Sequence, residues 1–261
     1  MIAVAAAGLM IMGLAACGGG DEATPGGEGG GEDLGLITEG SLTSASSGEY
    51  RPFSFKQDGK LVGFDKDIAD AVSKEMGLKS ETKTGEFDTL IQGVQSNRYD
   101  VVIGSMTPTE KREKAVSFTD GYYTSGAQAF VQESSDCTDP TKLKKATVGV
   151  ARGTTYADFL EGKGWVGEVK TYASDVTALE DLSNGRLDAV VTDKLVGLNQ
   201  IKEAEKPLKD CGKLLYEEKP AFAVKKDNEA LIKALNEALA TVKEDGTYAK
   251  LSEKWFGQDI S

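Results

Sequence analysis

A unit of helix, turn and buried strand occurs twice in this chain, and this repeat constrains the fold more than any other feature. Residues 89–105 read TLIQGVQSNRYDVVIGS and residues 178–193 read ALEDLSNGRLDAVVTD. Both place a helical stretch, a polar turn with an arginine (Arg98 and Arg186), an Asp and a β-branched strand in the same order. We therefore predict two lobes of similar design, although unrelated helix–turn–strand units can also look alike.

Short β-branched runs alternate with amphipathic helical patterns from residue 36 onward. Strand-like runs cover residues 100–104, 146–151 and 188–192. Two helical stripes recur at intervals of three to four residues, Phe64, Ile68, Val72 and Met76, then Leu231, Leu235, Ala238 and Val242. This alternation predicts an α/β fold in which helices cover both faces of the sheets.

The first 16 residues have the character of an export signal. They are uncharged and mostly apolar, and as a helix they would extend about 24 Å, less than the ~30 Å hydrocarbon core of a membrane. Leu14-Ala15-Ala16-Cys17 matches the lipobox of bacterial lipoproteins, in which the Cys is lipidated. We predict a signal peptide over 1–16 and a lipid anchor at Cys17 on the outer face of the cell membrane. An ordinary secretory signal with an incidental Cys is the alternative, and no Lys or Arg precedes the apolar run.

The segment after Cys17 is predicted to be a tether. Residues 18–35, GGGDEATPGGEGGGEDLG, are rich in Gly and acids and contain no base. Such a composition buries almost nothing apolar, so a flexible coil is expected over 17–35. The folded part of the chain is therefore expected to comprise residues 36–261.

Composition excludes several classes of function. The chain has no His, which removes Ser-His-Asp and Cys-His nucleophile systems and HExxH zinc sites. Its 30 Lys and Arg against 42 Asp and Glu give a net charge of −12, whereas nucleic-acid binders carry a basic footprint. We expect a binding protein without a cofactor or a metal, and no nucleic-acid partner.

Three acids near the first helical stripe superficially resemble a calcium loop. Asp65, Asp67 and Asp70 lie close together in the sequence, but the sixth position of the loop is not Gly. Because they also lie within the helical stripe, we interpret them as a solvated helix face.

The loop after the first repeated strand is suited to an anion. Thr107, Pro108 and Glu110 have the form of a capping box with Pro at the first helical position, so a helix is expected to begin here with free N–H groups. Arg112 follows and can form a bidentate contact with a carboxylate. Taken alone, Arg112 beside Glu113 is equally typical of a solvated surface charge.

The loop after the second repeated strand is suited to a cation. Asp193 is the first residue past that strand, and a carboxylate there can bind an ammonium group, although it can also simply cap the next helix. Thr154 and Thr155 follow another strand and offer further donors. Open α/β sheets bind ligands at the carboxyl ends of their strands. An anion site on one lobe and a cation site on the other fit the zwitterion of an α-amino acid.

Several segments together resemble the polar amino-acid-binding proteins of ABC importers, which are family 3 extracellular solute-binding proteins. The resemblance runs from about Leu42 to Phe256 and rests on YRPF (50–53), GKLVGFD (59–65), FD (87–88), DVVI (100–103), MTPTEKR (106–112) and FTDGYY (118–123). It implies a two-lobed fold of the periplasmic-binding-protein type II with two crossover hinge strands, near 126–132 and 220–225. Lobe 1 would comprise 36–127 and 221–261, and lobe 2 would comprise 128–220.

The resemblance also implies a set of ligand-binding residues. These are Ser47, Tyr50, Phe87, Gly104, Ser105, Thr107, Arg112, Thr154, Thr155 and Asp193. Arg112 would bind the ligand carboxylate, with Ser105, Thr107 and the Thr154-Thr155 loop donating further hydrogen bonds. Asp193 would bind the α-ammonium group, and Tyr50 and Phe87 would enclose the aliphatic stem. Relatives often carry an acid at the position of Ser47, which nearby Glu49 would replace only if its backbone turned it inward.

The implied function is that of an extracytoplasmic substrate-binding lipoprotein. It would capture a polar L-amino acid between its lobes and deliver it, as a monomer, to the permease of an ABC importer with its cytoplasmic ATPase. It would not be an enzyme. Two alternatives remain: a dehydratase-like enzyme on the same scaffold, with Asp or Glu as general acid and base, and a ligand-sensing domain that docks on a membrane kinase.

Cys137 and Cys211 remain after the lipobox Cys. Two leftover cysteines of an exported protein usually pair. They flank the second lobe near its entry and exit, so we expect a disulfide between them, with two free buried thiols as the alternative.

Overall fold

The computed structural model describes residues 33–164 and 166–261. The predicted signal peptide, Cys17 and all but the last residues of the predicted tether lie outside the described residues. Among the helices that are described, none has the length and apolar character needed to cross a membrane.

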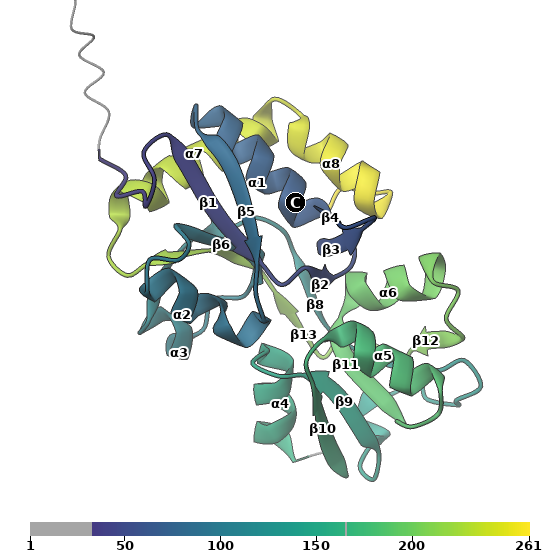
Figure 1. The fold of residues 1–261 in the computed structure, drawn as a ribbon. Coiled ribbons are helices and arrows are strands. Elements are labelled where there is room, and N and C mark those ends of the chain that lie inside the picture. The colour runs from purple at the N-terminus through teal and green to yellow at the C-terminus, as the bar shows by residue number, and fades with distance from the viewer. Residues whose placement is uncertain (1–32, 165) are drawn as a thin grey trace, which may run out of the picture. The chain divides into compact units, whose positions relative to one another are not determined.

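Two sheets organise the chain from Asp33 to Ser261 (Figure 1). The first sheet has the order β5 (Lys79–Thr84), β1 (Ser41–Ser46), β6 (Val101–Met106), β14 (Ala221–Lys225) and β7 (Val116–Gly121). The second has the order β10 (Glu168–Tyr172), β9 (Thr147–Ala151), β11 (Ala189–Asp193), β8 (Ser125–Gln132) and β12 (Leu208–Asp210), with β13 (Tyr216–Glu218) also pairing with β8. A small ribbon of β2 (Glu49–Tyr50), β3 (Ser54–Gln57) and β4 (Lys60–Val62) accompanies the first sheet.

Helices pack against both sheets, as the α/β prediction requires. The helices of the first sheet's lobe are α1 (Phe64–Glu75), η1 (Phe87–Thr89), α2 (Leu90–Gln95), α3 (Glu110–Glu113), α7 (Glu229–Glu244) and α8 (Thr247–Phe256). The helices of the second sheet's lobe are η2 (Pro140–Lys142), α4 (Thr155–Lys163), α5 (Asp175–Ser183) and α6 (Lys194–Glu203). In Figure 1 these helices and strands form two lobes, and the fold class predicted from the sequence is confirmed.

The predicted repeat is also confirmed by equivalent hydrogen bonds. In the first lobe, Asp100 before β6 accepts the N–H of Thr43 in β1 at 2.7 Å. In the second lobe, Asp188 before β11 accepts the N–H of Thr147 in β9 at 2.7 Å. Both β6 and β11 lie third in their sheets, parallel to the strand before them and followed by an antiparallel strand. The two lobes therefore share one topology.

The chain passes between the sheets twice. It leaves the first sheet after β7 and enters the second at β8, and it returns from β13 to β14. The segments expected as hinge strands, 126–132 and 220–225, pair within the second and the first sheet respectively. The links between the sheets are consequently short, at 122–124 and 219–220.

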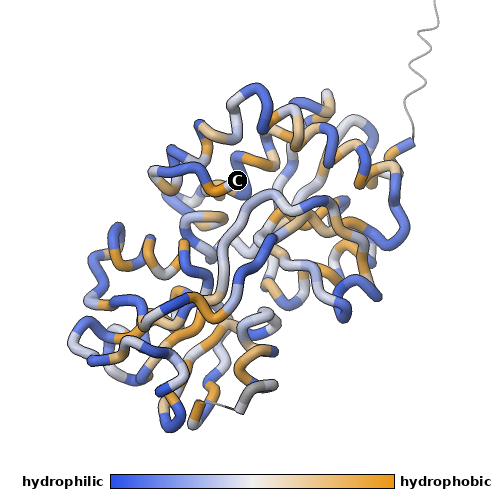
Figure 2. Tube along the Cα trace, turned by 180° about the vertical axis from the view of Figure 1, so that it is seen from behind, coloured by the Kyte–Doolittle hydropathy of each residue, from blue (hydrophilic) through white to orange (hydrophobic). Residues whose placement is uncertain are grey.

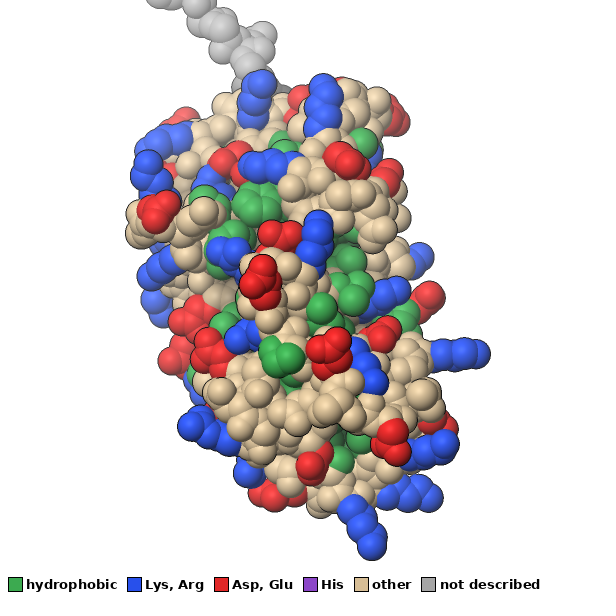
Figure 3. Space-filling model, turned by 90° about the vertical axis from the view of Figure 1, so that its right-hand side faces the viewer, with side chains coloured by type: hydrophobic (Ala, Val, Ile, Leu, Met, Phe, Trp, Pro, Cys, Tyr) green, Lys and Arg blue, Asp and Glu red, His purple; other side chains and the backbone are tan. Residues whose placement is uncertain are grey.

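The predicted helical stripes form the core of the first lobe. Helix α1 buries Phe64, Ile68 and Val72, and α7 buries Leu231, Leu235, Ala238 and Val242 against the same cluster. Burying a side chain of Leu or Phe size stabilises the fold by about 1.5–3 kcal/mol. Figure 2 shows hydrophobic segments in both lobes and hydrophilic segments at many outer turns. On the face seen in Figure 3, acidic and basic side chains are interspersed.

One interpretation of the acids near α1 is wrong. Asp65 is fully buried, not solvated, because it points into the lobe and forms hydrogen bonds there. Asp67 does lie toward solvent and pairs with Lys254 at 2.6 Å, and Asp70 pairs with Lys66. Within the described part of the chain, no group of three acidic or thiol side chains is arranged to hold a metal ion.

Cys137 and Cys211 form a disulfide in the second lobe. Their Cα atoms are 5.3 Å apart, and the bond closes a loop with a sequence separation of 74 residues. In the chain-entropy model a loop of that size stabilises a fold by about 4 kcal/mol. The bond joins the segment after β8 to the segment after β12.

Candidate functional site

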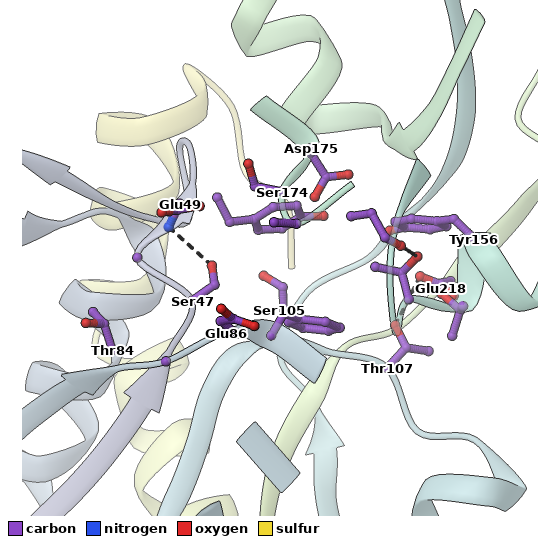
Figure 4. Close-up of a pocket in the computed structure, with 18 of the residues that line it drawn as sticks. Ser47, Glu49, Thr84, Glu86, Ser105, Thr107, Tyr156, Ser174, Asp175 and Glu218 are labelled. Carbon is purple, nitrogen blue, oxygen red and sulfur yellow. Dashed lines mark hydrogen bonds between the residues drawn. The ribbon is translucent and has the colours of Figure 1, made fainter. Parts of the chain in front are cut away.

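A cavity of about 310 Å³ lies between the two sheets. Most of the predicted binding residues line it, namely Ser47, Tyr50, Phe87, Ser105, Thr107, Arg112, Thr154 and Thr155. Gly104 and Asp193 are not among the lining residues. In Figure 4, Ser174 and Asp175 of the second lobe face Ser105 and Thr107 of the first across the cavity. The cavity suits a small polar molecule.

Arg112 lies on the first-lobe wall at the short helix α3. Its Nη1 donates to the carbonyl oxygen of Thr107 at 2.6 Å, and its Nη2 donates to that of Gly153 in the second lobe at 2.9 Å. The guanidinium also lies over the ring of Phe87, 5.6 Å from its centroid. Burial lowers the pKa of Arg112, and no carboxylate of the described residues forms an ion pair with it. The charges of Glu218 and Asp158 oppose this effect of burial, so Arg112 is a partly buried cation with acids nearby but without an ion pair.

The helix that carries Arg112 begins later than predicted. Thr109, not Thr107, is the N-cap, and its hydroxyl accepts the N–H of Arg112 at 3.2 Å. Helix α3 has only four residues. The capping-box pattern predicts a start two residues earlier, but the Thr107 hydroxyl donates to Glu218 of the second lobe and caps no helix. An anion here would be bound by the guanidinium and not by a helix N-terminus.

Three predicted residues on the first-lobe side are occupied by contacts within the protein. Ser105 donates its N–H to the Tyr122 hydroxyl at 2.9 Å and its own hydroxyl to Asp65 at 3.1 Å. Thr107 donates to Glu218 at 3.0 Å. Gly104 is a packing residue, since a Cβ there would come within 3.1 Å of the Ser46 backbone in β1. The donors of Ser105 are therefore engaged inside the lobe.

On the second-lobe wall, Thr154 starts helix α4. Its hydroxyl accepts the N–H of Ala157 at 3.1 Å and donates to the carbonyl oxygen of Ala151 at 2.7 Å. Thr155 and Tyr156 follow it into the cavity lining. The Thr154 hydroxyl therefore forms its hydrogen bonds within this wall, and Thr155 lines the cavity beside it.

Asp193 is fully buried behind the second-lobe wall. Its Oδ1 accepts the Ser125 hydroxyl at 2.9 Å and the N–H of Leu195 at 2.7 Å, so it caps helix α6. Its Oδ2 is buried without a hydrogen-bond partner. Burial raises the pKa of Asp193 to about 7. Burial also raises the pKa of Tyr50, which lines the cavity, and the charge of Asp193 adds to that shift. The carboxylate therefore lies close to the cavity although it is not part of the lining.

Two buried acidic residues of the lining were not predicted. Asp175, at the start of α5, accepts the Thr192 hydroxyl at 2.5 Å, and burial raises its pKa to about 6. Glu218 in β13 is buried and accepts the Thr107 hydroxyl. Asp175 lies just past the end of β10, after Ala173 and Ser174, so the rule that sites form at strand ends could have found it. Glu218 has no such signal, because it reaches the cavity only through the pairing of β13 with β8.

The rims of the two lobes touch beside the cavity. Arg152 of the second lobe pairs with Asp88 at 2.8 Å and with Glu86 at 2.5 Å, both of the first lobe. Gly153 has a φ of +72°, and a Cβ there would lie 2.7 Å from the Cβ of Asp88. Glycine is needed at this position for both reasons. The structure therefore shows the lobes in contact around the cavity.

Comparison with known proteins places this architecture among binding proteins. The model of the bacterial extracellular solute-binding proteins, family 3, matches residues 42–258. The L-cystine-binding protein TcyJ of Escherichia coli K12 is 37% identical over 236 residues, which cover 88% of this chain and 89% of TcyJ. The structure of an ancestral arginine-binding protein bound to glutamine has a TM-score of 0.79 at 39% identity and covers 85% of this chain and 100% of its own.

One similar structure bears on the enzyme alternative. The ancestral amino acid-binding protein AncCDT-1, a precursor of cyclohexadienyl dehydratase, has a TM-score of 0.75 at 33% identity, with 83% of this chain and 95% of its own covered. It too is described as a binding protein.

Proposed function

The chain belongs to family 3 of the bacterial extracellular solute-binding proteins, and from this premise we propose that it captures an L-amino acid between its two lobes and delivers it to the permease of an ABC importer. The observation that carries the proposal is a pair of opposite charges on the two lobes. Arg112 on the first lobe forms no ion pair with a described carboxylate, and Asp193 on the second has a buried oxygen without a hydrogen bond.

The two charges suit the two ends of a zwitterion. A partly buried cation without an ion pair and a buried carboxylate oxygen without a hydrogen bond both cost free energy, which a ligand of complementary charge would offset. We assign the ligand carboxylate to Arg112 and the α-ammonium group to the Oδ2 of Asp193. Asp175 adds negative charge on the same wall. To reach Asp193, the ammonium group must enter beside Tyr50, whose pKa already responds to both acids.

The ligand's side chain is assigned to the space between Tyr50 and Phe87. Both rings line the cavity, and their flat faces suit an aliphatic stem. Ser47 lies at this end of the cavity, and its hydroxyl accepts the N–H of Glu49 at 3.3 Å. Glu49 lines the cavity as well. A polar group at the far end of the ligand is therefore favoured over a purely apolar one.

Binding is proposed to work by closure of lobe 1, predicted as 36–127 and 221–261, on lobe 2, predicted as 128–220, with the first boundary moved to 122–124 because all of β8 pairs in the second sheet. A ligand held by Arg112 on one side and Asp193 on the other stabilises the closed state by its differential affinity for that state. The permease would bind this closed form. The short links at 122–124 and 219–220 would absorb the motion.

Attachment to the membrane is proposed to occur through Cys17, with the protein acting as a monomer. The tetrad of residues 14–17 supports lipidation. Mass spectrometry of the protein purified from its membrane fraction should find a diacylated N-terminal Cys. A Cys17→Ala variant should lose that mass and leave the membrane fraction. Recovery of the unmodified wild-type protein in the soluble fraction would contradict the anchor.

A thermal-shift screen tests the binding function. The probes are the twenty standard L-amino acids and L-cystine, and a ligand that binds only the folded state at 100 times its Kd adds about 2.7 kcal/mol of stability. Titration calorimetry of the best probe then gives the affinity. Recovery of that probe unchanged after long incubation is expected of a binding protein, and conversion to a product would instead support an enzyme. No shift with any amino acid would contradict the proposal.

A further inference from the structure

Ser105 has an unusual backbone conformation where the first-lobe strand β6 reaches the cavity. Its φ is +55°, in the left-handed region that favours glycine. A serine there is strained, and such strain persists only where the surroundings determine the conformation. Ser105 lines the cavity, and the chain continues from it to Thr107 and Arg112. The direction of the whole binding loop therefore depends on one strained residue.

Two buried side chains hold both donors of Ser105. The Tyr122 hydroxyl accepts its N–H at 2.9 Å, and the Asp65 carboxylate accepts its hydroxyl proton at 3.1 Å. The Tyr122 hydroxyl also donates to the other oxygen of Asp65 at 2.5 Å. Asp65 and Tyr122 are both fully buried. The three residues therefore form a closed triangle of hydrogen bonds.

The triangle joins parts of the sequence that are far apart. Asp65 comes from α1, Ser105 from β6, and Tyr122 from the link that follows β7. Neither Asp65 nor Tyr122 is among the residues that line the cavity. A buried carboxylate is costly to maintain, and burial raises the pKa of Asp65 to about 7. If Asp65 only filled space in the core, an apolar side chain would do so equally well.

We propose that Asp65 and Tyr122 are positioning residues for ligand binding, which fix Ser105 in its left-handed conformation and so direct Thr107 and Arg112 into the cavity. They act through Ser105 and touch no ligand. This inference rests on the proposed function, since it assigns the network to the same cavity.

Paired substitutions at Ser105 separate a positioning role from direct contact with a ligand. Ser105→Gly and Ser105→Ala both remove the hydroxyl, but only glycine accepts a φ of +55° without strain. If the backbone conformation is what matters, the Gly variant should bind within about threefold of wild type and the Ala variant at least about tenfold more weakly. Equal losses in the two variants would assign Ser105 a direct hydroxyl contact and overturn the proposal.

Tyr122→Phe removes the hydroxyl with little change of shape. It should weaken binding by about tenfold and speed hydrogen exchange at the Ser105 amide, whose acceptor is lost. Tyr248→Phe is the matched control: Tyr248 is equally buried, and its hydroxyl donates to the Tyr122 carbonyl oxygen at 2.6 Å. That control should lower thermal stability yet leave affinity and Ser105 exchange unchanged. Similar affinity losses in the two Phe variants would reduce Tyr122 to a general stabilising role.

Asp65→Asn serves as the third variant. The amide can accept from Tyr122 but cannot accept the Ser105 hydroxyl proton at its nitrogen, so an affinity loss smaller than that of Tyr122→Phe is expected. Combining Tyr122→Phe with Ser105→Gly should cost less than the two changes added, because glycine no longer needs to be held. Strict additivity would contradict the proposal.

The probes are L-arginine, L-glutamine and L-cystine, measured by titration calorimetry on each folded variant. If none of them nor any standard amino acid binds the wild-type protein, the proposed function fails. The exchange rate of the Ser105 amide and the stability difference between the Gly and Ala variants need no ligand. Unchanged Ser105 exchange in Tyr122→Phe would overturn the positioning role by itself.

Discussion

The two repeated strands, β6 and β11, occupy equivalent places in their sheets but end differently. After β6 the chain continues without a helix through 107–109, so Thr107 and Arg112 both reach the cavity. After β11 helix α6 begins at once, and Asp193 turns back to cap it. The first strand end therefore presents its charge in the cavity lining, while the second keeps its charge buried behind the wall.

This difference shows that a shared topology does not dictate a shared role. The length of the connection after each strand decides whether a charged side chain has its polar atoms free. Arg112 has two of its nitrogens bound to carbonyl oxygens and none to a carboxylate. Asp193 has one oxygen used as a cap and the other left without a partner. Each strand end supplies one charge without an ion pair by a different local route.

Loss of the first-lobe charge should have the largest effect. Arg112→Ala is expected to weaken amino-acid binding by at least about 100-fold, because truncating one partner of a buried charge pair costs about 2–5 kcal/mol. Arg112→Lys should recover only part of this, since lysine lacks the planar fork. Lys111→Ala, next to it and exposed, is the control and should bind normally. Normal calorimetric affinity in Arg112→Ala would remove the residue from the site.

Loss of the second-lobe charge should have the second-largest effect on affinity. Asp193→Asn keeps an oxygen that can cap α6 but loses the charge, and we expect about 30-fold weaker binding. Asp175→Asn, on the same wall, should cost less because its carboxylate is already bound by Thr192. Calorimetry of both variants decides between them. A larger loss in Asp175→Asn would move the ammonium site from Asp193 to Asp175.

Binding and folding should respond to pH in opposite directions. Burial raises the pKa of Asp193 to about 7 and that of Asp175 to about 6, and a bound ammonium group would lower both. Affinity should therefore be highest above pH 7 and fall by up to about tenfold per pH unit below it. In the ligand-free protein these carboxyls bind protons more tightly when folded, so their contribution to stability is present near pH 4 and is lost as pH rises to 7.

Two measurements over pH 5 to 8 check this. Calorimetry in buffers of different ionisation enthalpy should detect proton release on binding near pH 6.5, and urea melts should give the opposing stability trend. Asp193→Asn should flatten the affinity profile. A wild-type affinity that does not change between pH 5 and 8 would show that no buried carboxyl receives the ammonium group.

The rim contact should have the smallest effect. Arg152 joins the lobes through Glu86 and Asp88, but these side chains are partly exposed, and exposed ion pairs contribute about 0–1 kcal/mol. Arg152→Ala should weaken binding by less than about fivefold by favouring the open form. Arg186→Ala is the control, because Arg186 pairs with Asp181 inside one lobe. Equal effects of both variants on affinity would mean that the rim pair does not influence closure.

Much of the fold follows from the sequence because it depends on local patterns. The helical stripes of α1 and α7 and the repeat around β6 and β11 are periodic signals that packing reinforces. The strand-end rule predicts Arg112 at the cavity, and the family resemblance predicts Tyr50 and Phe87 there; the lining includes all three. These features need no knowledge of how the lobes meet.

The remaining features depend on contacts between distant segments. Burial of Asp65 could not be predicted, because its partner Tyr122 lies 57 residues away and the helix pattern alone suggests a solvated acid. Glu218 reaches the cavity only through strand pairing. Its carboxylate accepts the Thr107 hydroxyl, and Thr107 does not cap the helix as the capping-box motif predicted. The error at Thr107 falls at the cavity, where local rules yield to the requirements of binding, whereas Asp65 lies outside the lining.

The most direct test of the account is a comparison of a free amino acid with its α-carboxamide, measured by calorimetry on wild type and Arg112→Ala. The probe is whichever of L-arginine, L-glutamine and L-cystine binds most tightly. Wild type should bind the carboxamide at least about 100-fold more weakly, whereas Arg112→Ala should bind both forms with nearly equal, low affinity. If the variant still prefers the free carboxylate by the wild-type ratio, Arg112 does not bind that group and the assignment of opposite charges to opposite lobes is wrong.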